Sequence, residues 1–299
     1  MGHDHRSSAD QHRGALAVTL VLSTAVLIAQ VAGALVSDSL ALLADAGHSL
    51  SDVVGVAAAL IAIAWARRPA PAHRTFGRYR VEVLAAAVNG LLLLGIAAYV
   101  LIEVGSRWGD PSPVAAGPMI IVAAASILAN AVGVILLRRG AKESITIRGA
   151  YLEVLGDMLG SIAVLAAGAV IALTGFVRAD AIASVLIAAF IVPRAIRLLA
   201  EAWSVFAEGA PRGISIDEVR QHMSSVPGVV EVHDLHLWTI TSGMPVVSAH
   251  VVVTEEALAE GHGAAVLERL QECLGDCFAV THCTFQIEPP GFPEAEGHA

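Results

Sequence analysis

The chain has 299 residues, of which 56% are hydrophobic and 15% are charged, and its mean hydropathy is +0.70. This composition excludes an ordinary soluble domain of this length, because such domains carry roughly 25% charged residues. The formal net charge of −9 provides no basic excess for a phosphate backbone, so no nucleic-acid partner is expected. The three cysteines, all after residue 270, do not form a secreted disulfide framework.

Six predominantly apolar stretches are long enough to cross a lipid bilayer, which requires about 20 residues per helix. They are 15–36, 40–66, 81–104, 114–137, 147–174 and 179–200. We therefore predict an α-helical membrane protein in which residues 15–207 form a domain of six transmembrane helices, preceded by a histidine-bearing cytoplasmic tail of residues 1–14.

Lysine and arginine are distributed unevenly between the loops that join these spans. Loops 67–80 and 138–148 carry five and four such residues, whereas the loops on the opposite side contain only Arg107 and Arg178. Because basic residues concentrate in cytoplasmic loops, and the number of spans is even, both termini are expected in the cytoplasm.

Residues 208–288 have the polar, acidic composition of a soluble domain. A helix is predicted over 215–225, with Ser215 as N-cap and Glu218 at the capping-box position. Further elements are strands at 229–241 and 246–254, a helix at 257–273 and a strand at 281–288. This order predicts a small cytoplasmic α+β ferredoxin-like domain, followed by a disordered tail at 289–299.

Two of the predicted spans carry ionisable side chains at membrane depth, where charge is costly and marks a functional site by default. In the second span, Asp45, His48 and Asp52 follow at spacings of three and four, which place them on one helix face. Glu153 and Asp157 are four apart in the fifth span, and small residues around both groups allow the helices to approach closely. The predicted shared site consists of His48, Asp52, Glu153 and Asp157, with Asp45 as a nearby outer carboxylate or a helix-end group.

One imidazole and three carboxylates can form a four-ligand cage for a divalent first-row cation. The three carboxylates exceed the charge of such an ion by one, and ligands must be deprotonated in order to bind metal. Metal loading is therefore expected to be coupled to proton release, as an ion–proton exchanger requires.

Four motifs accompany the six spans and the ferredoxin-like tail: HSLSD at 48–52, EVLGD at 153–157, TFGRYRVEVLAA at 75–86 and HDLHLW at 233–238. Together they resemble the cation diffusion facilitator family over nearly the whole chain, and most closely its bacterial cobalt–zinc–cadmium resistance exporters. The resemblance implies a homodimer in the bacterial inner membrane. It also implies that the protein is a transporter and not an enzyme. It implies an antiporter that exports Zn²⁺, and also Co²⁺ or Cd²⁺, in exchange for protons by alternating access.

On this pattern His48, Asp52 and Asp157 are transport ligands, whereas Glu153 stands where zinc transporters more commonly have histidine. A carboxylate favours harder ions, so export of Mn²⁺ or Fe²⁺ is the alternative. Arg80 and Glu208 match a charge interlock at the dimer hinge of the family. The loop 67–80 is predicted to hold no metal site, because its histidine at position 73 is its only good ligand.

In the resembled family, histidines at the positions of His233, His250 and His282 bind zinc at a cytoplasmic dimer interface that senses metal. Thr284 replaces the family's usual aspartate, so the completeness of this site stays open. A strand period of two would place His233 beside Leu235 and Leu237, on the face opposite to that of His236.

The cysteines and the N-terminal histidines are not assigned to either metal site. Cys283 is expected to face the domain core, and Cys273 and Cys277 are expected to be core thiols rather than ligands. Metal capture by the histidines of the 1–14 tail stays open.

Two other classes of protein remain to be weighed against a transporter. An intramembrane metallohydrolase would place the same ligands around an activated water, but the chain has no HExxH motif, and four ligands leave no open position. A membrane metal sensor or scaffold would use the cytoplasmic tail and leave the intramembrane acids without a role.

Overall fold

The computed structural model describes residues 13–66, 75–138, 141, 145–241, 243–259, 263–280 and 282–293, which form two compact units. Three predictions lie outside these residues: metal capture by the N-terminal histidines, the absence of a metal site around position 73, and most of the disordered tail.

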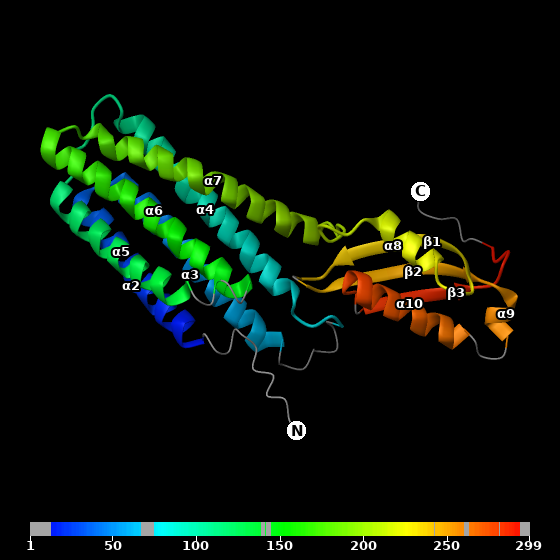
Figure 1. Cartoon of the computed structure of the whole chain (residues 1–299). Helices are drawn as coiled ribbons and strands as arrows, with labels where there is room; N and C mark the ends of the chain where they lie inside the picture. Colours follow the sequence, from blue (N-terminus) through cyan, green and yellow to red (C-terminus); the bar gives the residue numbers. More distant parts are fainter. Residues whose placement is uncertain are drawn as a thin grey trace, which may run out of the picture. The chain divides into compact units, whose positions relative to one another are not determined.

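Six long helices precede the sheet, in the order that the sequence predicts (Figure 1). They are α2 (Arg13–Ser37), α3 (Leu40–Ala66), α4 (Arg80–Arg107), α5 (Ala116–Leu137), α6 (Ile145–Thr174) and α7 (Arg178–Phe206). Among the described residues, five of them, all except α3, meet the length and hydropathy of a membrane span. Each predicted span coincides with one helix, and the largest difference is that α7 continues to Phe206 instead of residue 200.

The interior of the helical unit consists mainly of small and aliphatic side chains. Ala41, Val164 and Ala188 are fully buried in one cluster to which several of the helices contribute. Large apolar side chains such as Leu173 and Phe190 point outward and are more than half exposed. An apolar exterior of this kind fits a helix bundle whose solvent is lipid.

The first turn of α3 is capped by a buried carboxylate from α7. Asp180 accepts hydrogen bonds from the Ser39 hydroxyl at 2.5 Å and from the backbone N–H groups of Leu40 at 2.8 Å and Ala41 at 3.3 Å. These N–H groups have no partner within the helix itself. Asp180 therefore fixes the position of α3, the helix that carries His48 and Asp52, against α7.

The second unit contains a three-stranded sheet of order β1-β2-β3, with β1 antiparallel and β3 parallel to β2. Its elements are α8 (Ile216–Ser224), β1 (Val229–Thr239), β2 (Pro245–Val253), α9 (Glu255–Leu258), α10 (Gly263–Phe278) and β3 (His282–Glu288). The predicted N-cap is present, since the Ser215 side chain accepts a hydrogen bond from the N–H of Glu218. Helices α8 and α10 contact each other and share one core with the sheet (Figure 1).

Two details of this unit differ from the sequence prediction. The helix predicted over 257–273 is divided into α9 and α10, and α10 continues through Gly275 to Phe278. The predicted alternation of β1 is wrong after His233, because Asp234 adopts a φ of 46° in a bulge between His233 and His236. A bulge inserts one residue and reverses the faces that follow it. His233 therefore does not share the core face of Leu235.

We expect Asp180→Ala to lower the thermal stability of the purified protein, because three buried donors at the start of α3 lose their acceptor. The cost is about 1–3 kcal/mol. Thermal unfolding in detergent measures it, and Asp110→Ala, at an exposed residue between α4 and α5, is the matched control. Equal melting temperatures for the two variants would contradict the capping role.

Candidate metal centre

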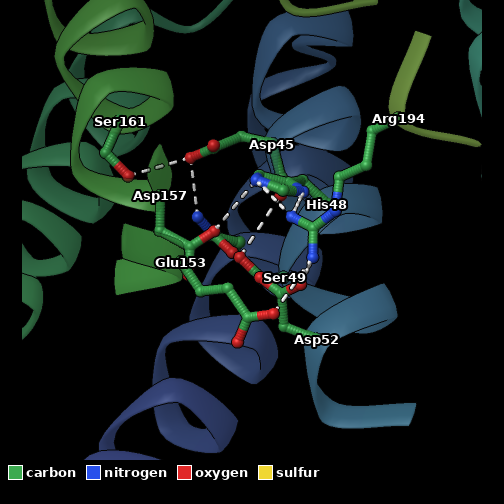
Figure 2. A network of polar contacts seen from close by, with 9 residues as sticks. Asp45, His48, Ser49, Asp52, Glu153, Asp157, Ser161 and Arg194 are labelled. Atoms are coloured by element: carbon green, nitrogen blue, oxygen red, sulfur yellow. Dashed lines mark hydrogen bonds and ion pairs between the residues drawn. The ribbon is translucent and has the colours of Figure 1, made fainter. Parts of the chain in front are cut away.

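Three of the four predicted transport ligands converge between α3 and α6. One donor atom from each of His48, Asp52 and Asp157 lies within 4.8 Å of the other two. Nε2 of His48 is 3.6 Å from Oδ1 of Asp157, and both side chains are almost fully buried. The spacing of one helical turn between His48 and Asp52 places both on the face of α3 that meets α6 (Figure 2).

Two carboxylate oxygens of this cluster are buried without a hydrogen-bond partner within the described part of the chain. They are Oδ2 of Asp52 and Oδ1 of Asp157. Buried polar atoms are normally paired, and unpaired oxygens turned into one cluster are suited to accept a cation or a proton. Carboxylate and imidazole donors at this distance match the ligand set of a divalent metal.

Gly160 on α6 allows α3 to approach closely. A Cβ atom added there would lie 2.3 Å from Oδ1 of Asp45, whereas one added at Gly156 would make an ordinary contact of 3.7 Å with Nε2 of His48. Any larger residue at position 160 would displace the Asp45 carboxylate. The small residues that the sequence places around the acids are therefore used for close contact between helices.

Glu153, the fourth predicted ligand, lies at the rim of the cluster. Its side chain is 45% exposed and is not among the three whose donor atoms meet. Its Oε1 is 3.3 Å from Nη2 of Arg194, a residue of α7 that also lies 2.8 Å from Oδ1 of Asp52 (Figure 2). Glu153 is thus connected to the cluster through a guanidinium.

Asp45 is separated from the ligand cluster by its own hydrogen bonds. Its Oδ2 accepts from Nε2 of Gln30 at 2.7 Å and from the Ser161 hydroxyl at 2.9 Å. The side chain is completely buried and joins α2, α3 and α6. This position agrees with an outer carboxylate that supports the cluster and does not enter it.

A second group of donors lies on the sheet, on the face opposite the helices. His233 and His250 are partners across β1 and β2, and their rings are 5.2 Å apart. Glu288 lies between them, with Oε2 3.0 Å from Nε2 of His233 and Oε1 2.9 Å from Nδ1 of His250. Glu288 is 3% exposed, although it ends a strand whose other residues on that face are exposed. These three residues could hold one divalent ion.

The structure does not bring the third predicted histidine to this group. His282 is exposed at the start of β3, pairs in register with Val246, and its ring packs against Phe76. Because β3 runs parallel to β2, it is the end of β3 that reaches His250. Thr284 is likewise exposed on β3, and a carboxylate is supplied four residues later by Glu288.

The bulge in β1 also changes the role of His236. His233 and His236 are separated by Asp234, whose Oδ1 is 2.9 Å from Nε2 of His236 and whose Oδ2 is 3.7 Å from Nε2 of His250. The prediction that His233 and His236 lie on opposite faces of β1 was therefore wrong. His236 is paired with Asp234 and is not among the three residues whose donor atoms meet.

The cysteines stay outside both groups of donors. Cys283 packs against the domain core as predicted, and burial raises the pKa of its thiol. Burial and the neighbouring Cys277 raise the pKa of Cys273. Cys277 is exposed, so its prediction as a core thiol is wrong. Raised pKa values keep Cys273 and Cys283 as neutral thiols, which are poor metal ligands.

Arg80 and Glu208, the predicted interlock, lie at the start of α4 and after the end of α7. Nη2 of Arg80 is 3.2 Å from Oε1 of Glu208, and both side chains are exposed. An exposed pair of this kind contributes about 0–1 kcal/mol. The Arg80–Glu208 ion pair therefore adds little to the folding stability of a single chain.

Sequence reasoning missed two residues of these sites. Arg194 lies within the predicted last span, and a charge at membrane depth is the same signal that identified the acids. Glu288 is the last residue of the predicted last strand, with the same parity as His282. An acidic residue on the same face of the last strand as His282, in a sheet expected to carry other histidines, could have indicated Glu288 as a ligand.

Models of two protein domains match nearly the whole chain. Residues 16–207 match the model of the cation efflux transmembrane domain, and residues 211–290 match that of the cation efflux protein cytoplasmic domain. The chain therefore belongs to the cation efflux family of multi-pass membrane transporters, with the predicted fold class of transmembrane helices followed by a small α+β domain.

Three curated relatives illustrate the similarity. The metal cation efflux system protein CzcD of Cupriavidus metallidurans is 40% identical over 287 residues, which cover 96% of this chain and 90% of the relative. The zinc transporter ZitB of Pectobacterium atrosepticum is 37% identical, with 96% and 89% covered. A cadmium, cobalt and zinc/H(+)-K(+) antiporter of Bacillus velezensis is 36% identical, with 96% and 92% covered.

We expect Glu288→Gln to weaken Zn²⁺ binding by the sheet unit of the full-length protein, because the two imidazoles lose their shared carboxylate. His282→Ala, on the same strand, is expected to leave the binding unchanged. Zn²⁺ titration of the purified protein against a fluorescent chelator measures both. Loss of a binding site in His282→Ala, with Glu288→Gln unaffected, would contradict this assignment.

Proposed function

We propose that the protein is a divalent metal cation antiporter that exports Zn²⁺ first, and also Co²⁺ and Cd²⁺, in exchange for protons. His48, Asp52, Glu153 and Asp157 are the proposed transport ligands. The observation that carries the proposal is the convergence of the His48, Asp52 and Asp157 donors between α3 and α6, inside the helical unit.

The chemistry of this cluster suits a transported ion. Two unpaired carboxylate oxygens provide places for either a metal ion or protons. Since ligands must be deprotonated to bind metal, loading the ion from one side releases protons, and proton entry from the other side favours its release. In this proposal alternating access exposes the cluster to each side in turn.

The proposed preference among metal ions follows from the types of donor atom in the cluster. One imidazole among carboxylates suits Zn²⁺ and Co²⁺, and the names of the relatives, which refer to zinc, cobalt and cadmium, support these ions. Glu153 at the rim adds a hard oxygen, which keeps Mn²⁺ and Fe²⁺ as alternative substrates. A metallohydrolase finds less support, because the family consists of transporters.

The second donor group and the topology complete the proposal. His233, His250 and Glu288 form a regulatory metal site in the cytoplasmic domain, and two copies of the chain form a homodimer, as supported by the family of this domain. The basic residues of loops 67–80 and 138–148 support a topology with both termini in the cytoplasm of a bacterial cell and the helices in its inner membrane. The Arg80 and Glu208 pair is proposed as an interlock at the dimer hinge.

We expect Asp52→Asn and Asp157→Asn each to abolish Zn²⁺ uptake driven by a pH gradient in inverted vesicles, because the amide cannot exchange a proton for the metal. Uptake is measured with a luminal zinc dye. Asp110→Asn, which removes an exposed carboxylate outside the cluster, is expected to transport like the parent. Normal uptake by both site variants would refute the proposed ligands.

We expect Glu153→His to raise the ratio of Zn²⁺ to Co²⁺ transport several-fold, since an imidazole replaces a harder oxygen donor at the rim. Initial rates for the two ions in the same vesicles give the ratio. Glu103→His replaces an acid of α4 outside the cluster and controls for the general effect of an added histidine. Equal ratios in Glu153→His and the parent would show that Glu153 does not select the ion.

A further inference from the structure

A permanently charged side chain from a third helix enters the proposed transport site. Arg194 extends from α7, and its Nη2 donates to Oδ1 of Asp52 on α3 at 2.8 Å and to Oε1 of Glu153 on α6 at 3.3 Å (Figure 2). Its Nη1 lies 3.5 Å from both ring nitrogens of His48. One guanidinium therefore contacts three of the four proposed ligands.

These contacts occupy one oxygen each of Asp52 and Glu153, two of the carboxylates that a metal ion would need. A guanidinium has donors only, and it does not lose its proton in proteins. It therefore satisfies acidic oxygens as a cation does, without titrating. Arg194 makes no hydrogen bond to Oδ2 of Asp52 or Oδ1 of Asp157, the two cluster oxygens that lack a hydrogen-bond partner within the described residues.

The formal charge of the site changes when Arg194 is included. Three ionised carboxylates give −3, and the guanidinium reduces this to −2, which equals in magnitude the charge of one divalent ion. A metal ion bound by His48, Asp52 and Asp157 would lie within a few ångströms of the guanidinium, where two like charges repel strongly outside bulk water.

From this geometry we propose that Arg194 is an internal cation that competes with the transported metal for Asp52 and Glu153 and so sets the affinity of the site. The inference rests on the proposed function. In the metal-free protein, Arg194 holds the two acids. Metal binding displaces the guanidinium from Asp52, and its return favours release of the ion.

The cycle of an exchanger explains why such a competitor is useful. A site of one imidazole and three carboxylates without a counter-charge would hold a divalent ion tightly and release it slowly. A transporter gains nothing from binding that is equally strong in every state, because release then limits the turnover. Arg194 weakens the bound state and stabilises the empty one.

The first test measures Zn²⁺ affinity of purified full-length protein in a His250→Ala background, which removes a donor of the cytoplasmic group. Arg194→Gln removes the charge and leaves a shorter, neutral hydrogen-bonding side chain, and we expect Zn²⁺ to bind on the order of tenfold more tightly. Arg194→Lys keeps the charge and is expected to bind less tightly than Arg194→Gln. The matched control is Arg197→Gln, one turn further along α7, where the guanidinium contacts the backbone carbonyl of Pro193.

Transport supplies a second readout in the same variants. Arg194→Gln is expected to lower both KM and the maximal rate of Zn²⁺ uptake, because binding is stronger and release is slower. An arginine that only holds helices together would give unchanged or weaker Zn²⁺ affinity in Arg194→Gln, and that result would overturn the proposal. Equal affinities in Arg194→Lys and Arg194→Gln would overturn it as well, since charge would then not matter.

A third measurement needs no substitution at position 194. Labelling of arginines with a dicarbonyl reagent, followed by mass spectrometry, reports whether Zn²⁺ frees the guanidinium of the unaltered protein. Labelling of Arg194 is expected to rise with Zn²⁺ while that of Arg197 stays constant. An unchanged or lower labelling of Arg194 would contradict displacement, even where Arg194→Gln does not fold.

Failure of this inference can be told apart from failure of the proposed function. If Asp52→Asn and Asp157→Asn lose transport but Arg194→Gln binds Zn²⁺ like the parent, only the role of Arg194 is refuted. If the two acidic variants transport normally, the ligand site itself is refuted, whatever the Arg194 variants do.

Discussion

Acidic side chains inside a hydrocarbon layer require partners, and this requirement determines how the helical unit is arranged. Asp45, Asp52, Asp157 and Asp180 are all largely buried, and each faces polar groups from at least one other helix. The helices therefore do not pack by apolar contact alone. Each buried acid fixes which faces of α2, α3, α6 and α7 meet, in a solvent that offers no other hydrogen-bond donors.

The two groups of donors differ in the way their charge is compensated. In the sheet, Glu288 lies between the imidazoles of His233 and His250, so one carboxylate serves two histidines. In the helices, one imidazole faces several carboxylates, and the excess of acid is met by Arg194. The first arrangement suits an ion that is retained, whereas the second keeps a competing cation beside the ligands.

Much of the fold follows from patterns that are local in the sequence. The long apolar stretches predict the helices, and the spacing of His48 and Asp52 predicts a shared helix face because the helical repeat is regular. The role of Arg194 could not be predicted, since nothing local indicates which face of α7 meets α3. In β1 the single positive φ of Asp234 reverses the alternation, and a residue that departs from the regular repeat leaves no periodic signal.

Helix α3 is attached to α7 at two places, and in the proposed cycle only one of them responds to metal. At its start, Asp180 accepts from a serine hydroxyl and two backbone N–H groups, none of which a metal ion would replace. Three turns later, Asp52 is paired with Arg194, and a metal ion at Asp52 competes for the same carboxylate. In the proposed cycle the attachment at Asp180 persists while that at Asp52 is exchanged. Any metal-dependent movement of α3 against α7 is therefore expected around Asp52, with the capped end as the fixed point.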